Sequence, residues 1–255
     1  MIKYSVSDRI GYITLNNPEK RNSLDANMVT SLRQIFKQAE SDDNVKVIVL
    51  NANGNIFSSG ADLGYIQSLQ NKTLEENLAD SQNLMFLFET IYTLSKVVIA
   101  QIEGAAVAAG CGLATVCDVS FAVPEAVFGY TEVQIGFVPA IVSVFLLRKV
   151  GEARAKELLL SGKLVSAEIA CQLGLINFVE DNNQIKDTVR RYALNLCSDA
   201  SAESLRLTKM LIAQTQSMHI ANALLMASQV NAQARTSEDC KRGIAAFLNK
   251  EKVNW

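Results

Sequence analysis

Two stretches of small residues predict backbone amides that are free to bind an anion. Residues 101–118 read Gln-Ile-Glu-Gly-Ala-Ala-Val-Ala-Ala-Gly-Cys-Gly-Leu-Ala-Thr-Val-Cys-Asp, with small residues where a core element usually has large ones. A helix beginning near Ala109 would direct unpaired N–H groups and the positive end of its dipole toward an anion. This pattern indicates half of an oxyanion hole, although close helix packing explains the same residues equally well.

The second stretch follows the apolar run 45–50. Residues 51–63 read Asn-Ala-Asn-Gly-Asn-Ile-Phe-Ser-Ser-Gly-Ala-Asp-Leu, which predicts a strand, a loop and then a helix start at Gly60-Ala61-Asp62. Here too a small residue, Ala61, lies where a helix begins. Two such amides can bind one oxygen if a sheet brings the two helix starts together.

Five segments resemble the enoyl-CoA hydratase/isomerase (crotonase) superfamily over nearly the whole chain. They are Asn-Asn-Pro-Glu-Lys-Arg-Asn-Ser-Leu (16–24), Phe-Ser-Ser-Gly-Ala-Asp-Leu (57–63), Ile-Glu-Gly-Ala-Ala-Val-Ala-Ala-Gly-Cys-Gly (102–112), Phe-Gly-Tyr-Thr-Glu-Val-Gln-Ile-Gly-Phe-Val-Pro (128–139) and Gly-Ile-Ala-Ala-Phe-Leu-Asn-Lys (243–250). Each segment alone is a weak match. Their shared order and spacing make the resemblance specific.

The resemblance implies a site for an acyl-CoA thioester, with CoA as part of the substrate and no separate cofactor. The N–H groups of Ala61 and Ala109 would hold the thioester oxygen and stabilise an enolate. Glu132 matches a family glutamate that moves protons. Without the resemblance, a glutamate at this position would be taken for a helix-start or surface residue.

Gly112 departs from the family pattern, because the well-known hydratases carry a second glutamate there. Two activities remain open: a hydratase that works with Glu132 alone, or a Δ3-Δ2 enoyl-CoA isomerase that needs one base. A catalytically weak acyl-CoA-binding protein is a third possibility. The residues around Glu132 and 137–143 are similar to the bacterial methylglutaconyl-CoA hydratase-like branch, which favours a hydratase. Its substrate would carry a distal carboxylate, for which Arg148 is a candidate partner.

The resemblance also implies CoA contacts in three parts of the chain. The loop 17–22 would follow the nucleotide end, the residues around Ala61 would follow the pantetheine and acyl groups, and the C-terminal helix would touch the adenine or 3′-phosphate, in some relatives in a neighbouring subunit. Asp62 is better explained as stabilising a helix start. The contacts are Lys20, Arg21, Ser59, Ala61, Asp62, Leu63, Ala109, Phe247 and Lys250.

Other chemistries lack the residues that they need. His219 is the single histidine, so neither a Ser-His-Asp triad nor a histidine-rich metal site is expected. Gly104, Gly110 and Gly112 fit neither dinucleotide-binding nor phosphate-loop spacing. The five cysteines include no Cys-x-x-Cys pair and are odd in number, which argues against a disulfide framework and a zinc site.

Composition predicts a folded protein with a sizeable core. The chain has 255 residues, 49% hydrophobic and 20% charged, and a formal net charge of −2. No basic face indicates nucleic acid as a partner, and no segment is long and apolar enough to cross a bilayer. The first residues contain no apolar signal region, so we expect a cytoplasmic location.

The expected fold is α/β. Residues 2–7 and 11–15 predict a hairpin, 25–39 an amphipathic helix and 45–50 a strand buried on both faces. The resemblance implies a crotonase-like (ClpP/crotonase) spiral of repeated ββα units. We expect an acyl-CoA-binding core over 1–195 and a helical oligomerisation region over 196–255, forming a trimer or a hexamer, with a role in fatty acid metabolism or leucine degradation.

Overall fold

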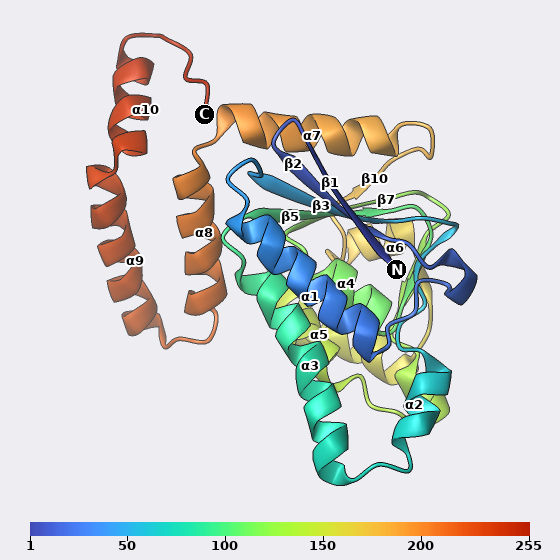
Figure 1. The fold of residues 1–255 in the computed structure, drawn as a ribbon. Coiled ribbons are helices and arrows are strands. Elements are labelled where there is room, and N and C mark those ends of the chain that lie inside the picture. The colour runs from blue at the N-terminus through green and yellow to red at the C-terminus, as the bar shows by residue number, and fades with distance from the viewer.

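A computed structural model describes residues 1–255, and a six-stranded sheet forms its centre (Figure 1). The strand order is β1-β2-β3-β5-β7-β10, with β1 and β2 antiparallel and the other neighbours parallel. The strands are β1 (Ile2–Ser7), β2 (Ile10–Leu15), β3 (Val47–Ala52), β5 (Val97–Ile102), β7 (Val119–Ala122) and β10 (Phe178–Val179).

A second, four-stranded sheet has the order β4-β6-β8-β9, in which β4, β6 and β8 are parallel and β9 is antiparallel to β8. Its strands are short: β4 (Ile56–Ser58), β6 (Ala105–Val107), β8 (Val127–Gly129) and β9 (Val165–Ser166). The chain repeatedly forms one strand in the large sheet, one in the small sheet and then a helical segment. This repeated ββα path confirms the predicted spiral α/β architecture.

Helices cover both faces of the large sheet (Figure 1). α7 lies across one face, and α1, α3 and α4 lie on the other. The helices of the core are α1 (Ala26–Ser41), α2 (Leu63–Leu69), α3 (Leu74–Thr93), α4 (Ala109–Val116), α5 (Ala140–Ser161), α6 (Ala167–Gln172) and α7 (Ile185–Asp199), with 3-10 turns η1 (Pro18–Lys20) and η2 (Glu132–Ile135). A cluster of 48 buried apolar residues fills the space between these layers.

The last three helices, α8 (Ala202–Thr215), α9 (Ile220–Thr236) and α10 (Glu238–Leu248), form an arm beside the core. α8 contacts α3 and β5, whereas α9 packs on α8 and α10 and has no buried residue. Exposed apolar side chains of the arm include Ile220, Leu224, Leu225, Ile244, Phe247 and Leu248. The division of the chain after residue 195 stays a prediction.

Long, periodic elements agree with the sequence-based expectations. The hairpin forms, Asp25 caps α1 by accepting a hydrogen bond from the Met28 N–H at 2.8 Å, and residues 47–50 of β3 are completely buried. The strands β4 and β6 were not predicted, because three residues are too few to show a periodicity. α5 begins at Ala140, and its backbone is non-helical only at Gly151.

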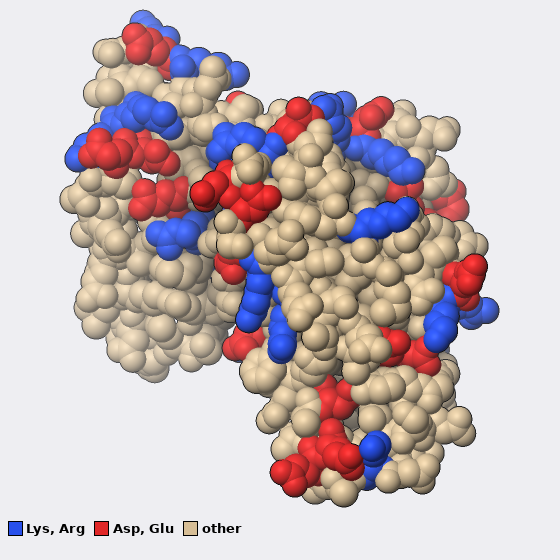
Figure 2. Space-filling view, in the orientation of Figure 1, with Lys and Arg blue, Asp and Glu red and all other residues tan.

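Charged side chains of both signs are interspersed on the visible face of the molecule (Figure 2). α9 carries a single charged residue, Arg235, near its end. None of the helices combines the length and the apolar composition that a membrane span requires.

The helix α4 packs directly on the backbone of β4. A Cβ atom added at Gly110 would lie 2.3 Å from the carbonyl oxygen of Ser58 and 2.7 Å from its Cβ. A side chain at residue 110 would therefore push the helix away from the strand, because the carbonyl cannot rotate aside. Glycine is needed here for the close approach of two backbones.

We expect Gly110→Ala to lower the free energy of unfolding by about 2 kcal/mol or more, as overpacking in a rigid site does. Gly64→Ala is the matched control, because the nearest atom to its new Cβ is Asp62 Oδ1 at 3.3 Å. This helical position should stay within about 1 kcal/mol of wild type. Urea denaturation measures both values, and equal stabilities for the two variants would contradict the proposed close packing.

Candidate active site

Three parallel strands deliver the predicted site residues to one edge of the small sheet. Ser58 of β4 pairs with Ala106 of β6, and Val107 pairs with Gly129 of β8. Because the strands are parallel, the turns after them lie at the same edge. These turns contain Gly60–Ala61, Ala108–Ala109 and Tyr130–Glu132, so the structure brings the predicted residues Ala61, Ala109 and Glu132 to neighbouring turns.

The backbone around Ala61 leaves its N–H group without an acceptor. The Leu24 N–H donates to the Gly60 carbonyl at 2.8 Å, and the Asp62 N–H donates to the Leu24 carbonyl at 3.0 Å. In this parallel bridge the Gly60 carbonyl and the Asp62 N–H are both paired with Leu24. The Ala61 N–H, by contrast, donates to no loop carbonyl or side chain. Ala109 is the first residue of α4, whose leading amides have no acceptor within the helix.

The two donor turns touch each other. A Cβ added at Gly60 would lie 3.2 Å from the Ala109 nitrogen. Ala61 and Ala109 also line the same small cavity, of about 40 Å³. The arrangement has the components of an oxyanion hole: two backbone amides, fixed in place, at the surface of one cavity.

Glu132 is a buried carboxylate without a hydrogen-bond partner for one of its oxygens. Its exposure is 8%, and Oε2 is inaccessible and unpaired. Burial raises the pKa of Glu132, because a low-dielectric environment disfavours the charged form. An unpaired buried carboxylate is costly to maintain, and such groups are concentrated at functional sites.

The chain entering η2 is fixed to α4 by a buried tyrosine. The Tyr130 hydroxyl lies 2.6 Å from the Thr115 hydroxyl, which donates to the Cys111 carbonyl at 2.9 Å. After η2, the Gln134 side chain donates to the Gly162 carbonyl at 2.7 Å. Glu132 therefore follows a residue anchored to α4 and precedes one anchored at the end of α5.

Apolar side chains occupy the space beside Gly112. A Cβ at this position would lie 2.5 Å from Val142 Cγ1 and 3.0 Å from Phe88 Cζ. A glutamate could not be accommodated without moving Val142. The sequence alone reveals that residue 112 is not a glutamate. Only the structure reveals that Val142 and Phe88 pack against this position.

The predicted CoA contacts near the N-terminus lie around the Ala61 turn. The Ser59 N–H donates to the Arg21 carbonyl at 3.1 Å, and Lys20 Nζ is 4.0 Å from an Asp62 carboxylate oxygen. Asp62 caps α2, and its hydrogen bond from the Tyr65 N–H is the main cause of its lowered pKa. Leu63, at 63% exposure, lies at the surface of this group.

Phe247 and Lys250 are not part of this group within one chain. Phe247 lies on α10 and Lys250 is the second residue after that helix, at the far end of the arm from α2 (Figure 1). Phe247 is 83% exposed. A contact between these residues and CoA bound near Ala61 therefore requires a second copy of the chain.

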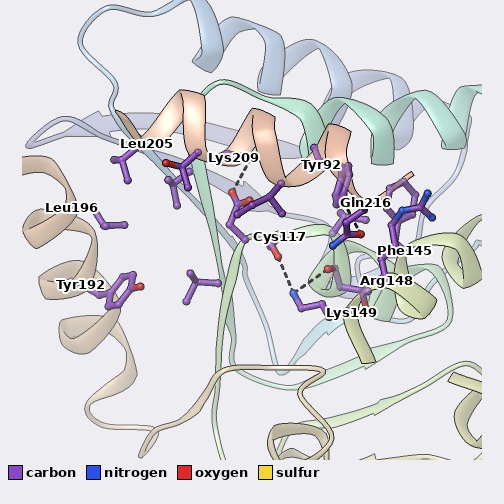
Figure 3. A pocket seen from close by; sticks show the side chains of 18 of the residues that line it. Tyr92, Cys117, Phe145, Arg148, Lys149, Tyr192, Leu196, Leu205, Lys209 and Gln216 are labelled. Atoms are coloured by element: carbon purple, nitrogen blue, oxygen red, sulfur yellow. Dashed lines mark hydrogen bonds and ion pairs between the residues drawn. The ribbon is translucent and has the colours of Figure 1, made fainter. Parts of the chain in front are cut away.

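A cavity of about 490 Å³ lies at the other end of α4 (Figure 3). Lys149 donates from Nζ to the carbonyls of Thr115 and Cys117 at 3.0 and 2.9 Å, and Lys209 pairs with Asp118 at 2.7 Å. These contacts secure the C-terminal end of α4 and the start of β7. Arg148 also lines this cavity, which places it away from the residues around Ala61 and Ala109.

The structure thus combines a ββα spiral, two turns of small residues with unpaired amides, and a buried glutamate. The family model for enoyl-CoA hydratase/isomerase matches residues 5–255. The chain belongs to the enoyl-CoA hydratase/isomerase family, which confirms the resemblance inferred from the sequence motifs.

Curated relatives match along almost their whole length. A Thermus thermophilus protein provisionally named enoyl-CoA hydratase is 42% identical over 241 residues, 94% of this chain and 95% of its own. The 2,3-dehydroadipyl-CoA hydratase of Escherichia coli is 32% identical over 255 residues, 98% of this chain and 96% of its own.

Solved structures share the fold. A Legionella pneumophila protein provisionally named enoyl-CoA hydratase/isomerase has a TM-score of 0.90 at 36% identity, covering 100% of this chain and 98% of the other. Human enoyl Coenzyme A hydratase domain-containing protein 3 has a TM-score of 0.91 at 29% identity, covering 100% and 99%. These similarities confirm the crotonase fold.

The burial of Glu132 predicts a pH-dependent effect on stability. Its pKa in the folded protein lies above the ordinary value of 4.5, so the folded state retains a proton that the unfolded state has lost as pH rises. Wild-type stability must therefore fall, relative to Glu132→Gln, from about pH 4 until the pH exceeds the raised pKa.

We expect Glu132→Gln to match the wild-type Tm near pH 4 and to exceed it near pH 8. Glu89→Gln is the control, because Glu89 is exposed on α3. Thermal unfolding at both pH values measures the difference. A Glu132→Gln variant less stable than wild type at pH 8 would mean that the carboxylate is stabilised by partners in the fold.

Proposed function

We propose that the protein catalyses reversible hydration of a 2-enoyl-CoA. The observation that carries the proposal is the location of three groups at one sheet edge: the unpaired amides of Ala61 and Ala109, and the buried Glu132. Relatives named as hydratases support the same reaction.

In this mechanism the thioester oxygen accepts hydrogen bonds from the Ala61 and Ala109 amides. Glu132 takes a proton from water as the water oxygen bonds to C3 and the electrons of the C2–C3 double bond move to the thioester oxygen. The resulting enolate collapses as Glu132 returns the proton to C2. One carboxylate thus serves as base and then as acid, which requires no group at residue 112.

An isomerase is the second candidate function, because the surroundings of Gly112 exclude the second carboxylate and an isomerase needs only one base. A side chain at residue 112 would collide with Val142 and Phe88, so the packing leaves no room for a second glutamate there. One base is sufficient to remove a proton from C2 of a 3-enoyl thioester and return it at C4. Binding of acyl-CoA without turnover is the third candidate.

For the acyl group, the charges around the small cavity beside the amides favour a neutral chain over a carboxylate-bearing one. Among its lining residues are Asp25 and Asp80, with no lysine or arginine. Asp80 also accepts a hydrogen bond from the Tyr65 hydroxyl, which connects α2 with α3. We therefore rank 3-methylglutaconyl-CoA below crotonyl-CoA as a substrate, and a role in leucine degradation below one in fatty acid metabolism.

The proposal includes an oligomer, a trimer or a dimer of trimers. The exposed apolar side chains of α9 and α10 support self-association. In such an assembly Phe247 and Lys250 would contact the nucleotide end of a CoA bound to a neighbouring copy, while Lys20, Arg21, Ser59 and Leu63 contact the CoA of their own chain. Asp62 would act mainly by capping α2. We propose a cytoplasmic location.

The test is to incubate the purified protein with crotonyl-CoA, 3-methylglutaconyl-CoA and 3-hexenoyl-CoA and to identify the products. We expect 3-hydroxybutyryl-CoA from crotonyl-CoA. Glu132→Gln should lower kcat by about 10²–10⁴-fold, the usual contribution of a general acid-base group. The Glu89→Gln variant should keep wild-type kcat.

Other products decide between the candidates. Double-bond migration in 3-hexenoyl-CoA without any hydration would replace the hydratase by the isomerase. Thioester binding without a change in any substrate, in both wild type and Glu132→Gln, would replace both by a binding protein.

A further inference from the structure

Ala108, the residue before α4, has a backbone conformation that alanine rarely adopts. Its φ is +52° and its ψ is −128°. The other non-glycine residues with positive φ are Asp8, Arg9, Arg21, Asn22 and Lys250, all long or polar. A methyl-bearing residue in this region is strained, and such strain persists only where the surrounding structure imposes it.

Hydrogen bonds on both sides hold Ala108 in this conformation. Its N–H donates to the Gly129 carbonyl at 2.7 Å, and its carbonyl accepts from the Gly112 N–H at 3.0 Å. The ψ angle of Ala108 sets the orientation of the next peptide group, which carries the Ala109 N–H. The strained angle therefore determines where this amide points.

The Ala108 methyl group also lies against the turn that carries the other amide. A Cβ added at Gly60 would lie 2.8 Å from Ala108 Cβ and 2.8 Å from the Val107 carbonyl oxygen. The methyl thus occupies the space between the turns at Gly60–Ala61 and Ala108–Ala109. Its size limits how closely the two turns can approach.

An independent observation points to a ligand near these turns. Glu132, three residues after the carbonyl that binds the Ala108 N–H, has a buried oxygen without any partner. Nothing in the fold uses this oxygen, so a bound molecule is its natural partner. Ala108 thus lies between the turns that carry the two free amides, and its N–H is hydrogen-bonded to the strand that precedes the unpaired acid.

We propose that Ala108 is a positioning residue, whose strained backbone and methyl group fix the direction of the Ala109 N–H and its separation from the Ala61 N–H. The inference rests on the proposed oxyanion hole. It makes Ala108 functional although its side chain carries no reactive group and is not expected to touch the substrate.

Ala108→Gly tests this, because glycine relieves the strain and removes the methyl. We expect kcat for crotonyl-CoA to fall about 10- to 100-fold, with KM changed less than about threefold, since misplaced donors weaken transition-state stabilisation more than substrate binding. The Tm should stay at or above the wild-type value, because strain relief offsets the greater freedom of glycine in the unfolded chain.

A spectroscopic measurement separates positioning from a structural role. Butyryl-CoA has no double bond to hydrate, and infrared difference spectra report how strongly its bound thioester carbonyl is polarised. We expect a shift to lower frequency with wild type and a smaller shift with Ala108→Gly. Ala108→Ser keeps a Cβ at this position and should preserve the wild-type shift. Ala114→Gly, a buried control in α4, should lower the Tm and leave the shift unchanged.

The outcomes distinguish this inference from the proposed function. A wild-type carbonyl shift that Ala108→Gly leaves intact would overturn the positioning role, even if crotonyl-CoA is hydrated. A carbonyl shift that Ala108→Gly reduces would support the role, even if wild type hydrates no substrate and the hydratase proposal fails. No carbonyl shift with wild type would overturn the positioning role together with the oxyanion hole.

Discussion

The site depends on close contact between two backbones, the first turn of α4 and the end of β4 with its following turn. Gly110 lies against the Ser58 carbonyl, and Gly60 lies against Ala108. Larger residues at positions 60, 108 or 110 would separate the two turns and the amides that the turns carry. The small residues are therefore steric requirements of the sheet edge, and the same requirement explains why the stretch 101–118 lacks the large residues of an ordinary core helix.

How much the sequence predicts depends on the length of the element. Long helices and β3 follow from periodicity, whereas β4 and β6 have three residues each, and β6 consists of two alanines and a valine. Alanine has a low strand propensity, so only pairing with β4 and β8 makes this segment a strand. The missed strands β4 and β6 are the ones that bring Ala61 and Ala109 to the edge where β8 places Glu132. The family resemblance supplied the residues of the site, and the topology supplies the physical reason for their proximity.

Other features of the site are not readable from residue identity. Ala108 is an unremarkable residue in a sequence, and its positive φ appears only when Gly129, Gly112 and Gly60 are placed around it. Similarly, Arg148 carries a charge suited to a carboxylate, but α5 directs it to the cavity at the other end of α4. Long-range packing decides both outcomes, and local sequence carries no signal of it.

The apolar filling at Gly112 extends this argument from structure to chemistry. In a site with two carboxylates, each raises the cost of ionising the other; here residue 112 is a glycine packed against Val142 and Phe88, and no second carboxylate contributes to the raised pKa of Glu132. Burial alone is the main cause of the raised pKa of Glu132. A carboxyl group whose pKa is moved toward neutrality can both accept and return a proton, which is what a single acid-base residue must do. Loss of the second glutamate and replacement of its space by apolar side chains are therefore compatible with catalysis by one group.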